Sequence, residues 1–127
     1  MLRKVLAIDD SPLILQIYKL FFSRFKDCSL VTAVNGLDAL DKLGQEKGID
    51  LILLDINMPV MNGLEFLERI RREPAYRGIP VIIISTEGKQ EDVIRGINMG
   101  AKGYVRKPFQ ASELDELISK VIGSASL

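Results

Sequence analysis

The sequence contains no histidine and a single cysteine, and these two absences exclude several classes of chemistry. Without histidine, the chain cannot form a histidine-ligated zinc site or a Ser-His-Asp or Cys-His catalytic site, and it cannot act as a phosphohistidine donor. Cys28 has no second cysteine to pair with in a disulfide. Its neighbours indicate no catalysis. We therefore interpret it as an ordinary reduced thiol, which favours a cytoplasmic location.

An excess of one charge and long apolar runs are also missing. The 17 basic residues balance the 17 acidic ones, so net charge does not support a general role at nucleic acids or membrane surfaces. The first apolar run, residues 5–8, is too short for a signal peptide or a membrane span. The 127 residues, 47% of them hydrophobic, are typical of one soluble domain. We expect that domain to cover residues 1–123, followed by a frayed tail at 124–127.

Five short apolar runs alternate with longer amphipathic segments. The strands expected from these runs are residues 4–9, 29–34, 50–55, 80–85 and 103–107. The first, third and fourth runs are almost continuously apolar, as in strands that are buried on both faces of a parallel sheet. The fifth run is the weakest and resembles an edge strand. The alternation predicts an α/β fold with a doubly wound parallel sheet and helices on both faces.

Helical periodicity fills the intervals between these runs. We expect helices after Ser11-Pro12, over residues 36–47, from Asn62-Gly63 to before Pro74, over residues 90–99, and from Ser112 to Gly123. In the first helix, the residues expected to face the core are Ile14, Ile17, Tyr18, Phe21 and Phe25. In the second helix they are Leu37, Leu40 and Leu43.

Several apolar residues of the first helix lie outside its expected core stripe. Leu15 and Phe22 share one flank, and Leu13 and Leu20 share the opposite flank. Such residues either mark a partner surface or pack on a neighbouring helix, and we favour the second interpretation because isolated exposed apolar residues are common.

Polar residues follow four of the five expected strands. They are Asp9-Asp10, Asp55, Ser85-Thr86 and Lys107. In open α/β sheets, ligands bind beyond the carboxyl ends of the strands. Three carboxylates at close range raise one another's pKa unless a cation compensates, and Mg²⁺ prefers oxygen ligands. We predict a magnesium site in which Asp10 and Asp55 ligate directly, Asp9 acts through water, and Asn57 adds its backbone carbonyl.

One of these carboxylates is a candidate nucleophile toward phosphorus. Asp55 is the better candidate, because it follows a central strand between the acid pair and Lys107. Lys107 and the metal ion would neutralise charge on the phosphoryl oxygens. Because an acyl phosphate is labile, the modification would be temporary, which suits a signalling role.

Five motifs in this order resemble the receiver domains of bacterial response regulators. The motifs are Asp9-Asp10, Asp55-Ile56-Asn57-Met58-Pro59, Asn62-Gly63, Ser85-Thr86 and Lys107-Pro108-Phe109, and the resemblance covers residues 4–122. It implies a flavodoxin-like sheet with strand order 2-1-3-4-5 and five helices. It also implies a two-component signalling switch, not an enzyme acting on other substrates. A histidine kinase or histidine phosphotransfer protein would phosphorylate Asp55, and a downstream protein would bind the fourth helix, fifth strand and fifth helix.

The resemblance also implies roles for single residues around the site. Ser85 would be the switch hydroxyl, Tyr104 the switch aromatic and Lys107 the phosphoryl-binding lysine, with a cis Lys107–Pro108 peptide bond. Thr86 occupies a position that is usually small in the family, so we expect its bulk to restrict access to the pocket. Asn57 and Glu87 occupy the positions that tune phosphoryl lifetime. Chemotaxis regulators carry the same two residue types, which favours fast autodephosphorylation.

Simpler interpretations exist for each motif and for the whole set. Asp9-Asp10 is compatible with helix capping, Lys107 with a solvated turn, and Tyr104 with edge-strand packing. A flavin carrier would need a Ser/Thr/Gly-rich loop after the first strand, where this chain has two aspartates. An aspartate-based phosphatase would carry its nucleophile after that strand and would have a cap. An interaction module without phosphorylation would be expected to lose part of the acid-and-lysine set.

The resemblance leaves two further questions open. The chain is either a stand-alone regulator or the receiver part of a longer protein, and it is either a monomer or a phosphorylation-dependent dimer. In both cases we expect no nucleic-acid binding by this domain and no membrane insertion.

Overall fold

Five strands and five helices alternate along the chain, as the sequence predicts. The computed structural model describes residues 2–86 and 90–123. The strands are β1 (Lys4–Ile8), β2 (Ser29–Ala33), β3 (Leu51–Leu54), β4 (Val81–Ser85) and β5 (Gly103–Arg106). The helices are α1 (Pro12–Phe22), α2 (Gly36–Gln45), α3 (Gly63–Arg71), α4 (Gln90–Asn98) and α5 (Ala111–Ile122).

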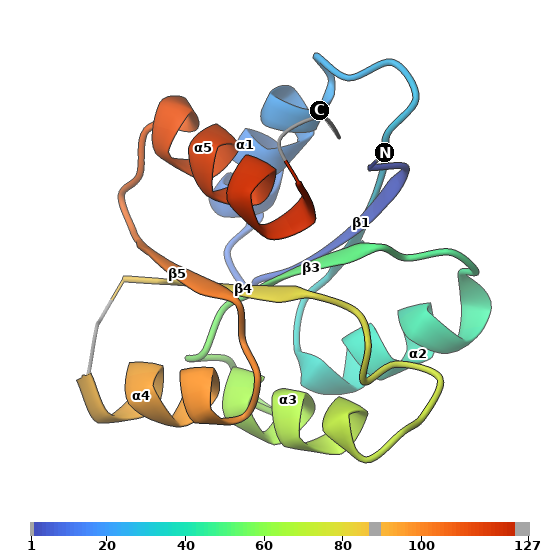
Figure 1. The fold of residues 1–127 in the computed structure, drawn as a ribbon, viewed down its shortest axis with the longest axis vertical. Helices are drawn as coiled ribbons and strands as arrows, with labels where there is room; N and C mark the ends of the chain where they lie inside the picture. The colour runs from blue at the N-terminus through green and yellow to red at the C-terminus, as the bar shows by residue number, and fades with distance from the viewer. Residues whose placement is uncertain (1, 87–89, 124–127) are drawn as a thin grey trace.

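The strands form one parallel sheet in the order β2-β1-β3-β4-β5, which confirms the flavodoxin-like order expected from the resemblance. Helices α1 and α5 cover one face of the sheet, and α2, α3 and α4 cover the other (Figure 1). β5 lies at one edge, as expected from its weak apolar pattern, and β2 lies at the other edge. The carboxyl ends of β1 and β3 are therefore neighbours near the centre of the sheet.

Successive residues of the central strands face opposite layers, so the sheet separates two hydrophobic cores. One core joins alternate strand residues, among them Leu54 and Ile83, to α2 and α3. The other joins the residues between them, among them Leu53 and Ile84, to α1 and α5. Because both faces are covered, every residue of β3 and β4 is buried. This explains why the two strands are nearly continuous apolar runs.

Helix caps fix where the loops at the carboxyl edge begin and end. The Ser11 side chain accepts a hydrogen bond from the backbone N–H of Ile14 and starts α1 directly after the acid pair. Asn62 and Glu65 form a capping box at the start of α3. At Gly63, a Cβ would lie only 2.2 Å from the backbone oxygen of Asp55, so only glycine lets α3 begin this close to the end of β3.

The side chains of two helices do not all face as predicted. In α1, Phe22 is buried with Tyr18 and Phe21, whereas Ile17 is 39% exposed. Helix α1 packs against α5 as well as the sheet, which moves its buried face away from the expected stripe. Leu13 and Leu20 stay exposed, on the flank predicted for them. In α2, Leu37 is 52% exposed, because Gly36, Ala39 and Leu43 form the buried face.

Two sequence predictions fall outside the described residues. They concern Glu87 and the tail at residues 124–127. Within the described ranges, no helix combines the length and the apolar character needed to span a membrane.

Candidate functional site

Three carboxylates meet at the carboxyl edge of the sheet. Asp9 and Asp10 follow β1, and Asp55 follows β3. One carboxylate oxygen from each of them lies within 4.8 Å of the others. The backbone N–H of Asp55 donates to the carbonyl of Ile8 at 3.0 Å, which continues the ladder between the two strands. Asp9 and Asp55 are buried and Asp10 is exposed, so the cluster opens to solvent on the side of Asp10.

Lys107 brings a positive charge to this cluster from β5. Its ammonium group donates a short hydrogen bond to Oδ2 of Asp9, and its Nζ lies 3.7 Å from Oδ1 of Asp55. The other oxygen of Asp9 accepts a hydrogen bond of 2.9 Å from the backbone N–H of Ser11. The backbone N–H of Lys107 donates to the carbonyl of Ser85 at 2.9 Å. The backbone of Lys107 is therefore bonded to β4, and its ammonium group lies beside Asp9 and Asp55.

The cluster carries more negative charge than Lys107 alone compensates. Burial raises the pKa of Asp55 to about 6, the charge of Lys107 opposes this rise, and the charges of Asp9 and Asp10 add to it. Three carboxylates against one ammonium leave room for a further cation. All three acids offer oxygen ligands, and the cluster has an open side, which is the donor set that Mg²⁺ uses in proteins.

A pocket of about 380 Å³ opens above the cluster. Its polar lining consists of Asp9, Asp10, Ser11, Asp55, Asn57 and Lys107. The less polar part of its lining consists of Ile14, Thr86 and Pro108. The peptide bond between Lys107 and Pro108 is cis, as expected from the resemblance. The pocket is therefore lined by charged and polar residues together with less polar ones.

The predicted site residues do not all line this pocket. Asp9, Asp10, Asp55, Asn57, Thr86 and Lys107 line it together. Ser85 is fully buried at the end of β4 and is not among the lining residues, whereas its neighbour Thr86 is exposed there. Tyr104 packs against the core that the sheet forms with α2 and α3, on the face that Ile83 also meets. Its buried hydroxyl has no hydrogen-bond partner among the described residues.

A family model for the response regulator receiver domain matches residues 5–119, a span that includes the acid cluster and Lys107. The chain belongs to this family. Receiver domains act as switches in two-component signalling and are not classical enzymes. The strand order, the acidic pocket and the family match thus agree on one fold and one general function.

Two curated relatives cover nearly the whole receiver. The chain is 34% identical to a chemotaxis protein CheY homolog of Campylobacter jejuni, over 97% of this chain and 95% of the relative. It is also 34% identical to the chemotaxis protein CheY1 of Helicobacter pylori, over 95% of this chain and 98% of the relative.

Solved structures give the same result for the fold. The chemotaxis protein CheY4 of Vibrio cholerae superposes with a TM-score of 0.86 at 34% identity, covering 95% of this chain and 99% of that one. The phosphorylated cyanobacterial phytochrome response regulator RcpA superposes with a TM-score of 0.84 at 25% identity, covering 100% of this chain and 99% of that one.

Sequence reasoning missed three residues that shape this receiver's pocket. Ser11 was predicted only as a helix cap, yet its backbone N–H also binds Asp9. Ile14 was assigned to the core stripe, yet it lines the pocket one helical turn after Asp10. Pro108 was noted for its peptide bond and also lines the pocket. Their closeness in sequence to Asp10 and Lys107 was the available indication.

Proposed function

We propose that this receiver accepts a phosphoryl group on Asp55 in a Mg²⁺-dependent reaction. The observation that supports this most strongly is the convergence of three carboxylates and Lys107 in one open pocket. Asp9 is engaged at both carboxylate oxygens, by Ser11 and by Lys107. Asp10 lies at the exposed side. Asp55 is the other buried acid in the pocket, and at 3.7 Å from the lysine Nζ its carboxylate is less engaged than that of Asp9, which favours it as the acceptor.

The donor set suits a magnesium ion. Asp10 and Asp55 would ligate it directly, and the backbone carbonyl of Asn57 would add a third ligand. Asp9 would act through water, because both of its oxygens already accept hydrogen bonds. When bound, Mg²⁺ supplies positive charge that offsets the carboxylates and the phosphoryl oxygens. Because Asp55 has a pKa of about 6, most of it is ionised at neutral pH even without the metal.

The chain's own residues account for the transfer step. A carboxylate oxygen of Asp55 forms a bond to phosphorus while the bond from phosphorus to the donor nitrogen breaks. The nitrogen keeps the electron pair, and the donor imidazole leaves as a neutral ring when its other ring nitrogen carries a proton, so no side chain of the receiver has to supply or remove one. The Lys107 ammonium, 3.7 Å from Asp55, then donates to a phosphoryl oxygen. Catalysis would rest on positioning and charge, as in other phosphoryl transfers.

A histidine kinase or a histidine phosphotransfer protein would be the physiological donor, since this chain has no histidine of its own. Thr86 lies exposed at the pocket, and we infer that it restricts access by small donors and water. Asn57 lines the pocket and would tune phosphoryl lifetime together with Glu87. By likeness to chemotaxis proteins at both tuning positions, we expect a short-lived phosphoryl group.

The output would be a changed surface over α4, β5 and α5. The phosphoryl group would attract the hydroxyl of Ser85, and Tyr104 would turn inward. Ile94 and Ile97 of α4 are exposed apolar residues that a downstream protein would cover. With a kinase and a protein target as partners, we expect the receiver to act in the cytoplasm.

Intact-mass measurement with a small donor tests the proposal. The protein is incubated with acetyl phosphate with and without Mg²⁺, beside Asp55→Asn and Thr86→Ala. We expect a Mg²⁺-dependent gain of one phosphoryl group, absent in Asp55→Asn and faster in Thr86→Ala. The proposal fails if neither the wild type nor Thr86→Ala gains the group with a small donor or with a phosphorylated histidine phosphotransfer domain.

A further inference from the structure

Lys107 is a buried charged residue that directly follows an edge strand. Only 7% of it is exposed, and its ammonium group lies between Asp9 and Asp55. β5 has a neighbouring strand on one side only, where the backbone N–H of Lys107 donates to Ser85. The segment that leaves β5 therefore needs another anchor to keep the ammonium group in place.

Phe109, two residues after Lys107, has such an anchor in Tyr18 of α1. The two rings are stacked with their centroids 6.0 Å apart and an angle of 15° between their planes. This separation lies within the range of offset aromatic pairs. Tyr18 is only 1% exposed and belongs to the core between the sheet, α1 and α5, against which Phe109 also packs. A rigid, buried ring on α1 thus holds the chain just beyond Lys107.

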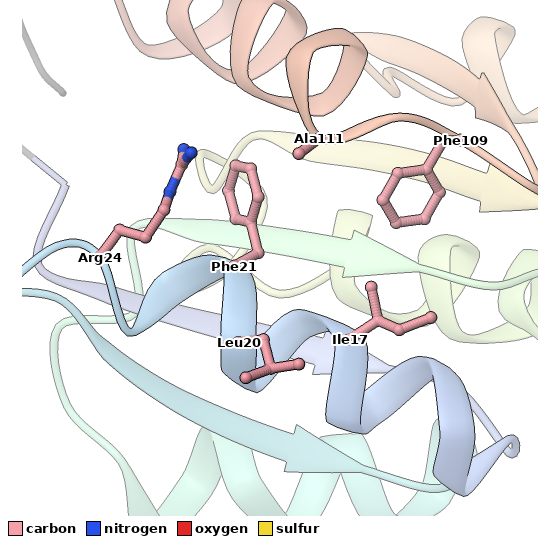
Figure 2. Close-up of a pocket in the computed structure, with 6 residues that line it drawn as sticks. All are labelled: Ile17, Leu20, Phe21, Arg24, Phe109 and Ala111. Atoms are coloured by element: carbon pink, nitrogen blue, oxygen red, sulfur yellow. The ribbon is translucent and has the colours of Figure 1, made fainter.

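Part of the surroundings of Phe109 is an open groove. Figure 2 shows its ring at one end of a groove of about 290 Å³ between α1 and the start of α5, which is lined by Ile17, Leu20, Phe21, Arg24, Phe109 and Ala111. Among the described residues, Tyr18 is the only aromatic ring paired with Phe109. Without the Tyr18 ring, Phe109 would keep only its other core neighbours and the groove beside it, so the segment that follows Lys107 would be freer to shift.

Tyr18 also lies close to the acids themselves. Burial raises the pKa of its phenol, and the negative charges of Asp9 and Asp55 raise it further. The phenol therefore stays neutral at physiological pH beside the buried acids.

We propose that Tyr18 is a positioning residue that holds the Lys107 ammonium between Asp9 and Asp55 by stacking on Phe109. Its effect on phosphoryl transfer rests on the function proposed above, whereas its effect on the place of Lys107 does not. The three carboxylates follow β1 and β3, so loss of the Tyr18 ring should slow transfer without removing a metal ligand.

Three variants of the full chain separate this role from general core packing. Tyr18→Phe keeps the ring, and Tyr18→Leu removes it. Phe22→Leu is the matched control, because Phe22 is a buried aromatic of the same helix and core that pairs with Phe21 and Phe25 instead. If Tyr18→Leu does not fold, Phe109→Leu removes the same stack from a half-buried position and takes its place.

The first measurement maps lysine acetylation by acetic anhydride with peptide mass spectrometry, in the absence of metal. The exposed Lys102 serves as the internal reference. We expect Lys107 to be protected in the wild type, Tyr18→Phe and Phe22→Leu, and to be labelled several-fold faster in Tyr18→Leu. The proposal is overturned if Tyr18→Leu labels Lys107 no faster than Phe22→Leu does.

The second measurement follows phosphorylation by acetyl phosphate and, separately, Mg²⁺ affinity by titration. Tyr18→Leu should be phosphorylated about tenfold more slowly, since small misplacements of a catalytic group cost this much or more. Its Mg²⁺ affinity should not fall below that of the wild type, because none of the proposed ligands is changed, and Tyr18→Phe should restore the rate. Transfer at the wild-type rate despite a labelled Lys107 also overturns the proposal. A wild type that binds Mg²⁺ but accepts no phosphoryl group refutes the proposed function, and the labelling result alone then decides the role of Tyr18.

Discussion

Residues 51–54 of β3 are buried in the sheet, and so is Asp55, the residue that follows them. Burial of the strand residues stabilises the fold, whereas burial of Asp55 opposes it. The four strand residues are apolar and at most 1% exposed, so their burial stabilises the fold. Asp55 is nearly as buried, at 5% exposed, and its raised pKa means that burial disfavours its charged form. In β1 a buried acid likewise follows a buried apolar residue, where Ile8 is followed by Asp9.

The site therefore depends on the core beneath it. An isolated group of three carboxylates and a lysine would not hold its shape in water. The ladder between β1 and β3 fixes two of the acids, and β4 fixes the lysine. The core should therefore respond little to pH or metal, whereas the carboxyl edge should respond to both.

Removal of the lysine should have the largest effect. Lys107→Met leaves Asp9 and Asp55 buried without their cation, and loss of one partner of a buried ion pair costs about 3–5 kcal/mol of unfolding free energy. Added Mg²⁺ should restore much of this loss. Urea unfolding at pH 7, with EDTA or with Mg²⁺, measures both effects. Lys102→Met, which changes an exposed lysine, should be near neutral, and an equal loss in both variants would contradict the prediction.

Truncation in the apolar centre of β3 should cost somewhat less and should not respond to the metal. Leu53 is fully buried, so Leu53→Ala should lower the unfolding free energy by about 2–5 kcal/mol through lost burial and a cavity. The same urea experiment should give the same loss with EDTA and with Mg²⁺. A loss that Mg²⁺ largely repairs would mean that the core and the carboxyl edge are not distinct.

Neutralisation of Asp55 should stabilise the metal-free protein. A carboxyl whose folded-state pKa is raised, from 3.8 to about 6, adds stability below the unfolded pKa and loses it as pH rises through about 6. At pH 7 in EDTA, Asp55→Asn should therefore be more stable than the wild type by about 1–3 kcal/mol. The advantage should shrink toward pH 4, and Mg²⁺ should stabilise the wild type more than the variant.

Thermal melts across this pH range, with Asp41→Asn as the exposed-acid control, check the prediction. An Asp55→Asn advantage that grows as the pH falls would show that its sign is wrong.

Relief of backbone strain should give the smallest effect. Val60, in the loop between β3 and α3, has a φ of 68° although it is β-branched, and it is 76% exposed. Asparagine adopts this left-handed conformation more readily, so Val60→Asn should stabilise the protein by about 0.5–1 kcal/mol. Val34→Asn tests an exposed valine outside the left-handed region and should give no gain. If both variants raise the urea midpoint equally, the gain comes from replacing an exposed valine and not from the positive φ of Val60.

The sequence was enough to predict the sheet and most of the site. Strand ends are local features, so Asp9, Asp55 and Lys107 could be assigned to one edge once the parallel sheet was recognised. The wrong predictions concern features that depend on contacts between residues far apart in the sequence. Which side of α1 is buried depends on α5 as well as on the sheet, and this reversed the predictions for Ile17 and Phe22.

The stack of Tyr18 on Phe109 could not be predicted from the sequence for the same reason. The two residues lie near opposite ends of the chain, and no local pattern joins them. The separation of Ser85 from the pocket lining depends on how β4 ends, where adjacent hydroxyl residues differ in burial. Composition and spacing do not determine that detail.

The central claim is that Asp55, and not Asp9 or Asp10, carries the phosphoryl group. The most direct test treats the phosphorylated protein with borohydride, which reduces an acyl phosphate of aspartate to homoserine, and then locates the changed residue by peptide mass spectrometry. We predict homoserine at position 55 alone, and only when Mg²⁺ was present during phosphorylation. Homoserine at position 9 or 10, or a modified residue of another type, would contradict the claim.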